Sequence, residues 1–382
     1  MTLTVGIDAS VVNSSAGGTR VYALQLLRAL VRLRPRWTFV LYLRRQDDEA
    51  ALGEIAASPN VRTRVVGSRP NAWRIQVDLA THLHADGVDI YHSLGYFLPL
   101  RWRGPKIITV HDLNIYVTAR NWLRPPTFLP WLDLVVQTGF SIHLADRVIT
   151  DSESSRRQIT TVMRLPAERV DVIPLAADPF FDERATAAEV AEVKVMVDDR
   201  PFVLFVGILS PQKNLLMLLR AFAASGLEER GTRLVLAGSD VEDYASTLLR
   251  SAGELGIRDS LVLTGFVARP VLRALYQTSL SVVLPSHGEG FGLPLVEAMA
   301  AGSPILAANR QAIPEVLGES GCLFEPNDVG SLAALLKRLA ADERFLADLK
   351  LRSSSGRGRF SWEKTAAATA AVYEEVVASR RR

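Results

Sequence analysis

Short apolar runs alternate with amphipathic segments along almost the whole chain. The runs are rich in Val, Ile and Leu and are bounded by glycine, proline or polar residues, which is typical of buried strands. The segments between them place apolar residues three and four positions apart, as residues 21–31 do, which is typical of helices that cover a sheet. Strands alternating with helices predict parallel, doubly wound sheets, so the expected fold class is α/β. The predicted strands are residues 3–8, 37–43, 61–66, 88–92, 106–112, 170–175, 201–207, 234–239, 261–267, 280–284 and 304–308, with residues 313–316 completing the pattern.

The chain is long enough for two such sheets, because 382 residues exceed one ordinary domain. Its 48% hydrophobic and 22% charged residues allow a sizeable core and argue against wholesale disorder. Residues 178–200, rich in Asp, Glu and Ala, form a break in composition and include an expected linker helix. We therefore predict a first domain over 1–177, a second over 178–360 and a C-terminal helix over 361–382.

The strongest chemical signal lies in residues 286–302, Ser-His-Gly-Glu-Gly-Phe-Gly-Leu-Pro-Leu-Val-Glu-Ala-Met-Ala-Ala-Gly. This stretch follows a predicted strand, opens with a glycine-rich turn and continues into a short helix. Pro294 suits the first turn of that helix, and Gly302 suits the position just past its end. Because glycines let backbone N–H groups approach a ligand and a helix N-terminus carries partial positive charge, the stretch predicts a diphosphate site.

Two carboxylates belong to this stretch, Glu289 in the turn and Glu297 about one turn into the helix. Carboxylates are poorly suited to phosphate, but they accept hydrogen bonds from sugar hydroxyls. An arbitrary pair of Glu residues would be two solvated charges. Here the order of glycine turn, proline and helix favours a site for a sugar joined to a diphosphate.

The same residues resemble the signature of retaining nucleotide-sugar glycosyltransferases of family 4, in which seven residues separate the two Glu. The resemblance implies the GT-B architecture, with two facing Rossmann-like domains and a final helix that crosses back to the first. It implies an N-terminal acceptor-binding domain and a C-terminal donor domain. It also implies that Glu289 contacts the donor hexose and that Glu297 holds the ribose hydroxyls. The backbone amides expected at the sugar and the diphosphate are those of Gly290, Phe291, Gly292 and Leu293.

Two histidines stand at carboxyl ends of predicted strands, the edge at which ligands bind in such sheets. For His92 this position is the only evidence. We assign His92 to the acceptor, and a purely structural role is an equally supported alternative. His111 lies in Thr-Val-His-Asp-Leu, which resembles the family motif whose His is near the donor sugar. We predict His111 and Glu289 as the catalytic residues, and Asp112 as a residue that caps or turns the chain.

A second glycine turn follows the first predicted strand, with Gly17, Gly18 and Arg20 leading into a helix. Most turns of this kind are only turns. The resemblance implies that this one closes on the donor diphosphate or on the acceptor. Residues 145–156 resemble the family as well, as a strand that ends in a serine-rich helix cap.

Two donor-binding residues are predicted at the start of the second domain, namely Gly207 and Lys213. Gly207 permits close backbone approach, and Lys213 resembles the family's diphosphate-binding lysine. Many members carry Arg directly after this glycine, where this chain has Ile208. A second cation on the phosphates is therefore missing or is supplied elsewhere, for example by Arg20.

The predicted strand at 261–267 leads, by the same resemblance, to the loop that touches the nucleobase. Phe266 and Val267 are therefore predicted on the base side of the donor, together with Arg273.

Residues 120–131 contain three Pro, two Trp and two Arg, so an irregular segment is expected there. Trp122 and Arg124 suit an acceptor-binding rim or a membrane interface, and a loop packed on its own domain is the alternative. Residues 1–176 hold 21 Lys and Arg against 15 Asp and Glu, a net +6, whereas residues 177–382 hold 23 against 26, a net −3. The basic half favours an anionic partner, such as a membrane surface or a lipid-linked acceptor, over nucleic acid, because no reader motif is present.

The single cysteine, Cys322, excludes an internal disulfide and suggests a reducing compartment. The N-terminal residues lack the features of a signal peptide, and no apolar stretch is long enough to span a bilayer. We therefore expect a cytoplasmic protein, peripheral at the inner face of the membrane if it contacts lipid.

The expected function is transfer of a hexose, such as mannose or glucose, from a nucleoside-diphosphate sugar to an acceptor hydroxyl, in polysaccharide or glycoconjugate biosynthesis. The resemblance implies retention at the anomeric carbon. No Asp-x-Asp stands at a predicted strand end, so we expect neither a metal nor another cofactor. Because both carboxylates are assigned to sugar hydroxyls, we expect a front-face mechanism without an enzyme nucleophile. The nucleotide (UDP, GDP, dTDP or ADP), the sugar and the acceptor stay open. The alternatives are a sugar-nucleotide epimerase or hydrolase on the same fold, and a catalytically silent nucleotide-sugar-binding subunit.

Overall fold

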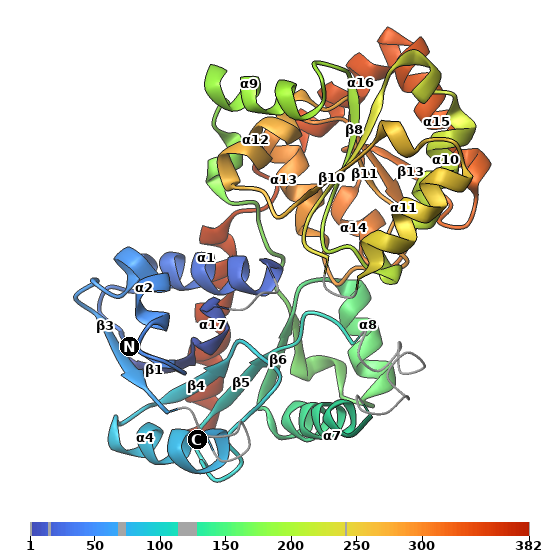
Figure 1. Ribbon diagram of the computed structural model, residues 1–382. Coiled ribbons are helices and arrows are strands. Elements are labelled where there is room, and N and C mark those ends of the chain that lie inside the picture. The colour runs from blue at the N-terminus through green and yellow to red at the C-terminus, as the bar shows by residue number, and fades with distance from the viewer. Residues whose placement is uncertain (1, 14–16, 68–73, 114–127, 241–242, 382) are drawn as a thin grey trace. The chain divides into compact units, whose positions relative to one another are not determined.

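The computed structural model describes residues 2–13, 17–67, 74–113, 128–240 and 243–381, with the backbone alone for 128–133 (Figure 1). The chain divides into two compact units. The first comprises Met1–Leu175 and Ser361–Arg382, and the second comprises Ala176–Phe360. Each unit is built on a parallel sheet with helices between most successive strands, so the predicted α/β class is confirmed.

In the described part of the first unit the sheet has seven parallel strands in the order β3-β2-β1-β4-β5-β6-β7. The direction of winding reverses between β1 and β4. The strands are β1 (Thr4–Asp8), β2 (Thr38–Leu43), β3 (Val61–Val65), β4 (Ile90–Ser93), β5 (Lys106–Thr109), β6 (Arg147–Thr150) and β7 (Val170–Val172).

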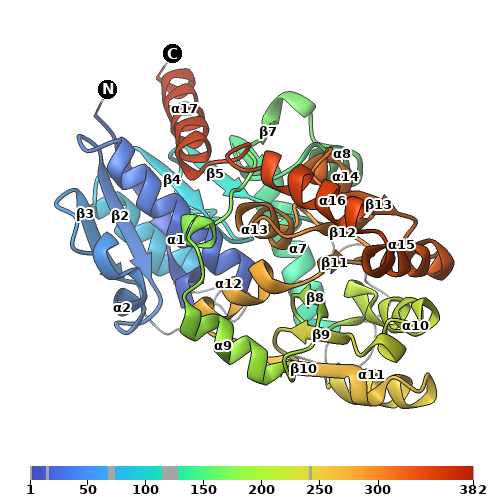
Figure 2. The same ribbon diagram turned by 90° about the horizontal axis from the view of Figure 1, so that it is seen from above.

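The C-terminal helix completes the first unit. Both views show α17 beside α1 on one face of this sheet (Figures 1 and 2). It buries Trp362, Tyr373 and Val376, so the predicted return of the final helix to the first unit is confirmed. The helices of this unit are α1 (Gly17–Leu33), α2 (Asp48–Leu52), α4 (Ala80–Ala85), α7 (Phe128–Leu144), α8 (Glu153–Val162) and α17 (Trp362–Arg380), with a π-helical turn at Arg74–Leu79.

The second unit repeats the same topology. Its described residues form a six-stranded parallel sheet in the order β10-β9-β8-β11-β12-β13, which reverses between β8 and β11. The strands are β8 (Phe202–Val206), β9 (Arg233–Ala237), β10 (Leu261–Gly265), β11 (Ser281–Leu284), β12 (Ile305–Ala308) and β13 (Cys322–Phe324). The helices are α9 (Ala187–Met196), α10 (Leu215–Ser225), α11 (Tyr244–Glu254), α12 (Arg269–Thr278), α13 (Leu293–Ala301), α14 (Ile313–Leu317), α15 (Val329–Ala341) and α16 (Glu343–Ser355).

Three elements differ from the sequence-based expectation. Residues 313–316 belong to helix α14, and the last strand is β13, a three-residue segment too short to leave a pattern. Helix α7 begins at Phe128, so the end of the segment expected to be irregular is helical. Pro130 is tolerated there because the first turn of a helix has no intrahelical acceptor for its N–H groups.

Candidate functional site

The two glycine-containing loops of the second unit leave its sheet at adjacent strands. Residues 207–214 follow β8, residues 285–292 follow β11, and β8 and β11 are hydrogen-bonded neighbours at the point where the strand order reverses. In a doubly wound sheet the chain diverges to opposite faces at this point and leaves a crevice beyond the strand ends. The fold therefore brings both predicted donor-binding segments of this unit to the position where such sheets bind ligands.

Hydrogen bonds fix the two loops to each other. The Asn214 side-chain amide donates to the carbonyl oxygens of Pro285, at 3.2 Å, and Pro326, at 2.8 Å. The backbone N–H of His287 donates to the carbonyl of Gln212 at 3.0 Å. Asn214 has a left-handed backbone (φ 54°) and directly precedes α10. These bonds hold the short 3-10 turn that ends in Lys213 against the loop that contains Glu289.

Lys213 and Glu289 form a close ion pair. The Lys213 ammonium lies 2.7 Å from Oε1 and 2.9 Å from Oε2 of Glu289, and the Ser286 hydroxyl donates to Oε1 at 2.6 Å. Both side chains are largely shielded from solvent, with 22% and 13% of their surface exposed. The predicted phosphate-binding cation and the predicted sugar-binding carboxylate are thus paired with each other. Ser286 is a member of this cluster that the sequence analysis did not single out.

The glycine turn and helix α13 have the predicted form. Gly292 precedes the helix with φ 95°, Pro294 lies in the first turn, and Gly302 ends the helix in a left-handed conformation. The side chain of Phe291 is buried and its ring packs edge-on against Phe360, with centroids 5.4 Å apart. Phe291 can therefore offer a ligand only its backbone, which is the contact predicted for it.

Glu297 lies inside the second unit beside a tyrosine. The Tyr276 hydroxyl, itself fully buried, donates to Oε2 of Glu297 at 2.8 Å. Burial raises the pKa of Glu297 to about 7, although the Tyr276 hydrogen bond and the charge of Arg269 act in the opposite direction. A carboxylate with a pKa in this range changes charge near neutral pH.

The residues predicted on the base side have different surroundings. Phe266 directly follows β10 with 81% of its surface exposed, and Val267 is partly buried. Arg273 is not available to a nucleobase, which corrects its prediction. Its buried guanidinium pairs with Glu189, at 2.7 Å, and Glu183, at 2.9 Å, and joins α12 to α9 and the segment before it.

In the first unit, His111 is paired with an aspartate at the next strand end. Asp151 directly follows β6 and is 2% exposed, and its Oδ2 lies 2.7 Å from Nδ1 of His111. Burial alone would lower the pKa of His111, but the charge and hydrogen bond of Asp151, with a smaller effect of Asp112, outweigh it and raise the pKa above the ordinary 6.5. His111 thus lies at the sheet edge where it was predicted.

His92 lies in the interior, which corrects its assignment to the acceptor. It is fully buried, its Nδ1 bonds to the Tyr373 hydroxyl at 2.6 Å, and its Nε2 bonds to Thr109 at 2.8 Å. Burial lowers the pKa of His92 to about 3, so the ring is neutral at physiological pH. Both ring nitrogens have partners within the first unit. Of the two roles that the sequence allowed for His92, the structure therefore supports the structural one.

The remaining predicted residues lie at the start of the chain and in the proline-rich segment. Gly17 and Gly18 form the first turn of α1 and are exposed, as is Arg20. Their N–H groups belong to the unpaired amides of a helix N-terminus. Trp122 and Arg124 lie outside the described residues.

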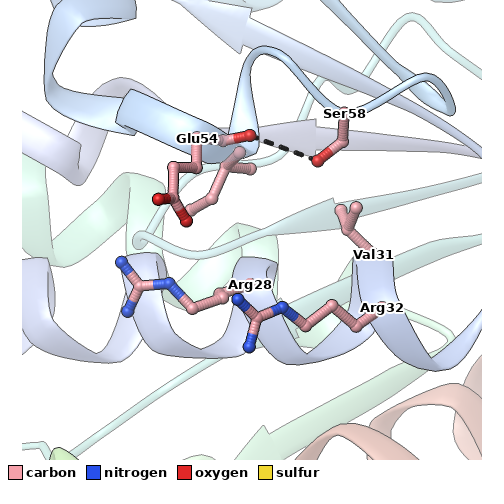
Figure 3. A pocket seen from close by; sticks show the side chains of 6 residues that line it. Arg28, Val31, Arg32, Glu54 and Ser58 are labelled. Carbon is pink, nitrogen blue, oxygen red and sulfur yellow. Dashed lines mark hydrogen bonds between the residues drawn. The ribbon is translucent and has the colours of Figure 1, made fainter.

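A small pocket elsewhere in the first unit has a separate set of residues. It lies between α1 and the turn at 53–58, with Arg28, Arg32 and Glu54 around it (Figure 3). Ser58 donates to the carbonyl of Glu54 at 3.2 Å. No residue predicted for the donor or the acceptor lines this pocket.

The described residues contain no group of three or more His, Cys, Asp or Glu side chains arranged to hold a metal ion. Nor do they contain a helix long and apolar enough to cross a membrane.

Family comparisons match both units. A model described as Glycosyltransferase Family 4 matches residues 16–179, and one described as Glycosyl transferases group 1 matches residues 188–355. O-antigen chain mannosyltransferase B of Escherichia coli is 28% identical over 287 residues, covering 75% of this chain and 74% of that protein. D-inositol 3-phosphate glycosyltransferase of Mycolicibacterium smegmatis is 29% identical over 396 residues, covering 96% and 88%. MMP alpha-(1->4)-mannosyltransferase of Mycolicibacterium hassiacum is 32% identical over 294 residues, covering 72% and 66%.

Solved structures share the fold at low sequence identity. HepE from Anabaena in complex with UDP and glucose has a TM-score of 0.74 at 19% identity and covers 98% of this chain and 100% of that one. Sucrose-phosphate synthase from Thermosynechococcus elongatus has a TM-score of 0.76 at 22% identity and covers 99% and 100%.

The two Rossmann-like units have the GT-B architecture that the solved structures share. The matching family models and relatives show that the chain is a glycosyltransferase of this class. Within that class, the chain belongs to glycosyltransferase family 4.

Proposed function

We propose that this protein transfers a hexose from a nucleoside-diphosphate sugar to an acceptor hydroxyl with retention at the anomeric carbon. The observation that carries the proposal is the Lys213–Glu289 pair at the switch point of the second unit, beside the N-terminus of α13. A cation and a row of backbone amides suit a diphosphate, and a carboxylate beside them suits the hydroxyls of an attached sugar.

Each residue then has a role that its chemistry supports. Lys213, the amides of residues 290–293 and the start of α13 stabilise the diphosphate, while Gly207 lets the backbone approach it. Glu289 and His111 contact the hexose, and Glu297 accepts hydrogen bonds from the ribose hydroxyls. The base lies at Phe266 and Val267, and the loop at Gly17, Gly18 and Arg20 closes on the diphosphate or the acceptor.

The proposed reaction is a metal-independent front-face displacement. The bond between the anomeric carbon and the diphosphate oxygen breaks, and the acceptor oxygen bonds to the same face of that carbon. The acceptor proton passes to the departing diphosphate, so no enzyme nucleophile is needed. The positive charge of Lys213 and the helix N-terminus offset the charge that develops on the leaving group. A trapped glycosyl adduct on Glu289 would contradict this mechanism.

The donor and acceptor are proposed from the relatives. Two of them are named mannosyltransferases, and one structural neighbour was solved with UDP and glucose. We propose mannose or glucose as the hexose and a saccharide or lipid-linked saccharide as the acceptor, with Trp122 and Arg124 on the acceptor side.

The test is turnover with GDP-mannose, UDP-glucose and ADP-glucose, each with and without an alkyl mannoside or glucoside acceptor. We expect one donor to release its nucleotide with the acceptor present and to form an α-linked product, as determined by NMR. Free sugar or an isomer formed equally well without acceptor would indicate a hydrolase or an epimerase. Nucleotide binding without turnover would indicate a silent subunit.

We also propose peripheral contact with an anionic membrane through the first unit. Helix α7 exposes Val136, Phe140 and Leu144, spaced four residues apart on one side, with Phe140 60% exposed. Apolar side chains on a basic protein surface favour an anionic lipid interface. Phe140→Glu should weaken binding to phosphatidylglycerol vesicles about tenfold or more. Leu351→Glu should not, although Leu351 on α16 of the second unit is more exposed, at 71%. Equal binding by both variants would contradict this contact.

A further inference from the structure

His111 is held on more than one side by residues of the first unit. The Ser155 hydroxyl donates to its backbone carbonyl at 3.0 Å, which ties it to the first turn of α8. The Tyr22 ring packs edge-on against the imidazole, with centroids 4.7 Å apart and planes at 86°, and its hydroxyl bonds to Thr109 at 2.8 Å. The ring therefore has little freedom to turn.

The Asp151 contact decides which ring nitrogen carries a proton. Since an ionised carboxylate only accepts hydrogen bonds, Nδ1 of His111 must donate to Oδ2 at 2.7 Å. The other nitrogen, Nε2, is buried and has no hydrogen-bond partner among the described residues, and the same holds for Oδ1 of Asp151. A buried polar atom without a partner is costly, and at a strand-end site it is explained when a ligand supplies the missing bond.

From this geometry we propose that Asp151 is a positioning residue, which fixes His111 with Nδ1 protonated and leaves Nε2 to bond a hydroxyl of the bound hexose. The inference rests on the proposed function for the presence of that hexose. A carboxylate or carbonyl behind an imidazole fixes its tautomer and orientation in the same way at other functional sites. None of the comparisons assigns a role to Asp151.

The effects of the charged and titratable groups around the His111 ring can be distinguished by substitution. Asp151 and Asp112 act on His111 as charges, the hydroxyls of Tyr22 and Tyr96 are buried nearby, and His92 is neutral. Asp112→Asn is therefore the matched control, because it removes the other carboxylate and leaves the Asp151 hydrogen bond in place.

The first test is ¹⁵N NMR of the imidazole rings in the full-length protein, with the His111 signals assigned by their loss in His111→Ala. We expect the wild type to show Nδ1 protonated in the neutral ring, and Asp151→Asn to lower the titration midpoint and populate the Nε2-protonated form. Asp112→Asn should keep the wild-type tautomer. A wild-type ring protonated on Nε2, or an unchanged tautomer and midpoint in Asp151→Asn, would overturn the proposal.

The second test is a double-mutant cycle on donor turnover. Asp151→Asn should lower kcat by about 10- to 100-fold with little change in KM. In the His111→Ala background the same change should have no further effect, because Asp151 acts through the imidazole. Equal losses in both backgrounds would overturn the proposal. Wild-type turnover in His111→Ala alone would instead remove His111 from the proposed function, and the NMR result would still decide the pairing.

Discussion

At the scale of single residues, Glu297 is buried, although its proposed role requires a charged carboxylate. A carboxyl group with a pKa raised to about 7 binds its proton more tightly in the folded than in the unfolded protein. Stability therefore falls as pH rises from about 4.5 to about 7. The proposed role at the ribose needs the ionised form, so the function operates against this preference.

This opposition predicts a pH-dependent affinity for nucleotide. Below about pH 7 the affinity should fall by up to roughly tenfold per pH unit, because the protonated carboxyl accepts fewer hydrogen bonds. Glu297→Gln should bind the nucleotide more weakly than the wild type at pH 8 and should lose this part of the pH dependence. Because the nucleotide phosphates titrate equally with both proteins, the comparison also corrects for their titration. Calorimetric titrations between pH 5.5 and 8.5 provide the measurement. Parallel pH profiles for the two proteins would contradict the assignment.

The Lys213–Glu289 pair predicts a difference between binding and turnover. Because Glu289 neutralises Lys213 in the free protein, a diphosphate must compete with it for the ammonium group. Glu289→Gln should therefore bind the nucleoside diphosphate as tightly as the wild type or a few-fold more tightly, yet turn over the sugar donor about 100-fold more slowly. Calorimetry and initial rates test the two parts. Nucleotide affinity reduced tenfold or more would contradict this competition, because it would mean that the Glu289 carboxylate supports nucleotide binding.

The sequence predicted the candidate site residues better than the side chains with which those residues pair. Residues 286–302 and Lys213 could be predicted as a donor site because the prediction depends only on the order of residues along the chain. Arg273 and His92 were assigned wrongly because their long-range partners, Glu189 on α9 and Tyr373 on α17, lie 84 and 281 positions away. Tyr276 left no local signal for the same reason, and Asp151 was predicted only as part of the strand end at 145–156, without its partner. Side-chain pairing across elements depends on the tertiary fold.

At the scale of elements, glycines let the strand ends of the second unit come together. A Cβ at Gly238, after β9, would lie 1.9 Å from the carbonyl oxygen of Gly207, after β8. Both residues have positive φ, at 154° and 151°. Backbone contact at this edge is thus possible only between glycines.

Gly238→Ala should consequently destabilise the second unit by at least about 2 kcal/mol, through steric overlap and backbone strain. Gly253→Ala is the matched control, since a Cβ there meets nothing within 4 Å and the residue lies in α11. It should be neutral or stabilise the protein by up to about 1 kcal/mol. Urea unfolding of the two variants measures the difference, and equal midpoints would show that the strand ends can separate freely.

At the scale of the whole molecule, the chain returns to its first unit after completing the second. Except for β13, the strands of both sheets and their order along the chain follow from alternation, and this return follows from the family resemblance. Specific contacts hold α17 on the first unit. Tyr373 is fully buried, its hydroxyl bonds to His92, and its ring centroid lies 6.3 Å from that of Trp37. Folding of the first unit therefore requires residues from both ends of the sequence.

Tyr373→Ala should destabilise the first unit by about 3–5 kcal/mol, as truncation of a buried aromatic side chain does. Hydrogen exchange should show the loss in β1 and β4 and leave β8 and β11 protected. Glu374→Ala, on the same helix, is the control: its side chain is 41% exposed and pairs with Arg34 at 3.4 Å, a surface contact of small energy, so neither unit should lose protection. Equal loss of protection in both units would mean that they unfold as one cooperative body.

The measurement that tests the central claim most directly is calorimetric binding of ADP, GDP, UDP, CDP and dTDP, with and without EDTA in the buffer. The comparison is between the wild type, Lys213→Met and Lys194→Met, whose lysine is exposed on α9 and pairs with Asp199. We predict that at least one nucleotide binds the wild type and the Lys194 variant equally, binds the Lys213 variant at least about tenfold more weakly, and is indifferent to EDTA. If no nucleotide binds the wild type, or if the Lys213 variant binds as tightly, the switch point of the second unit is not the donor site.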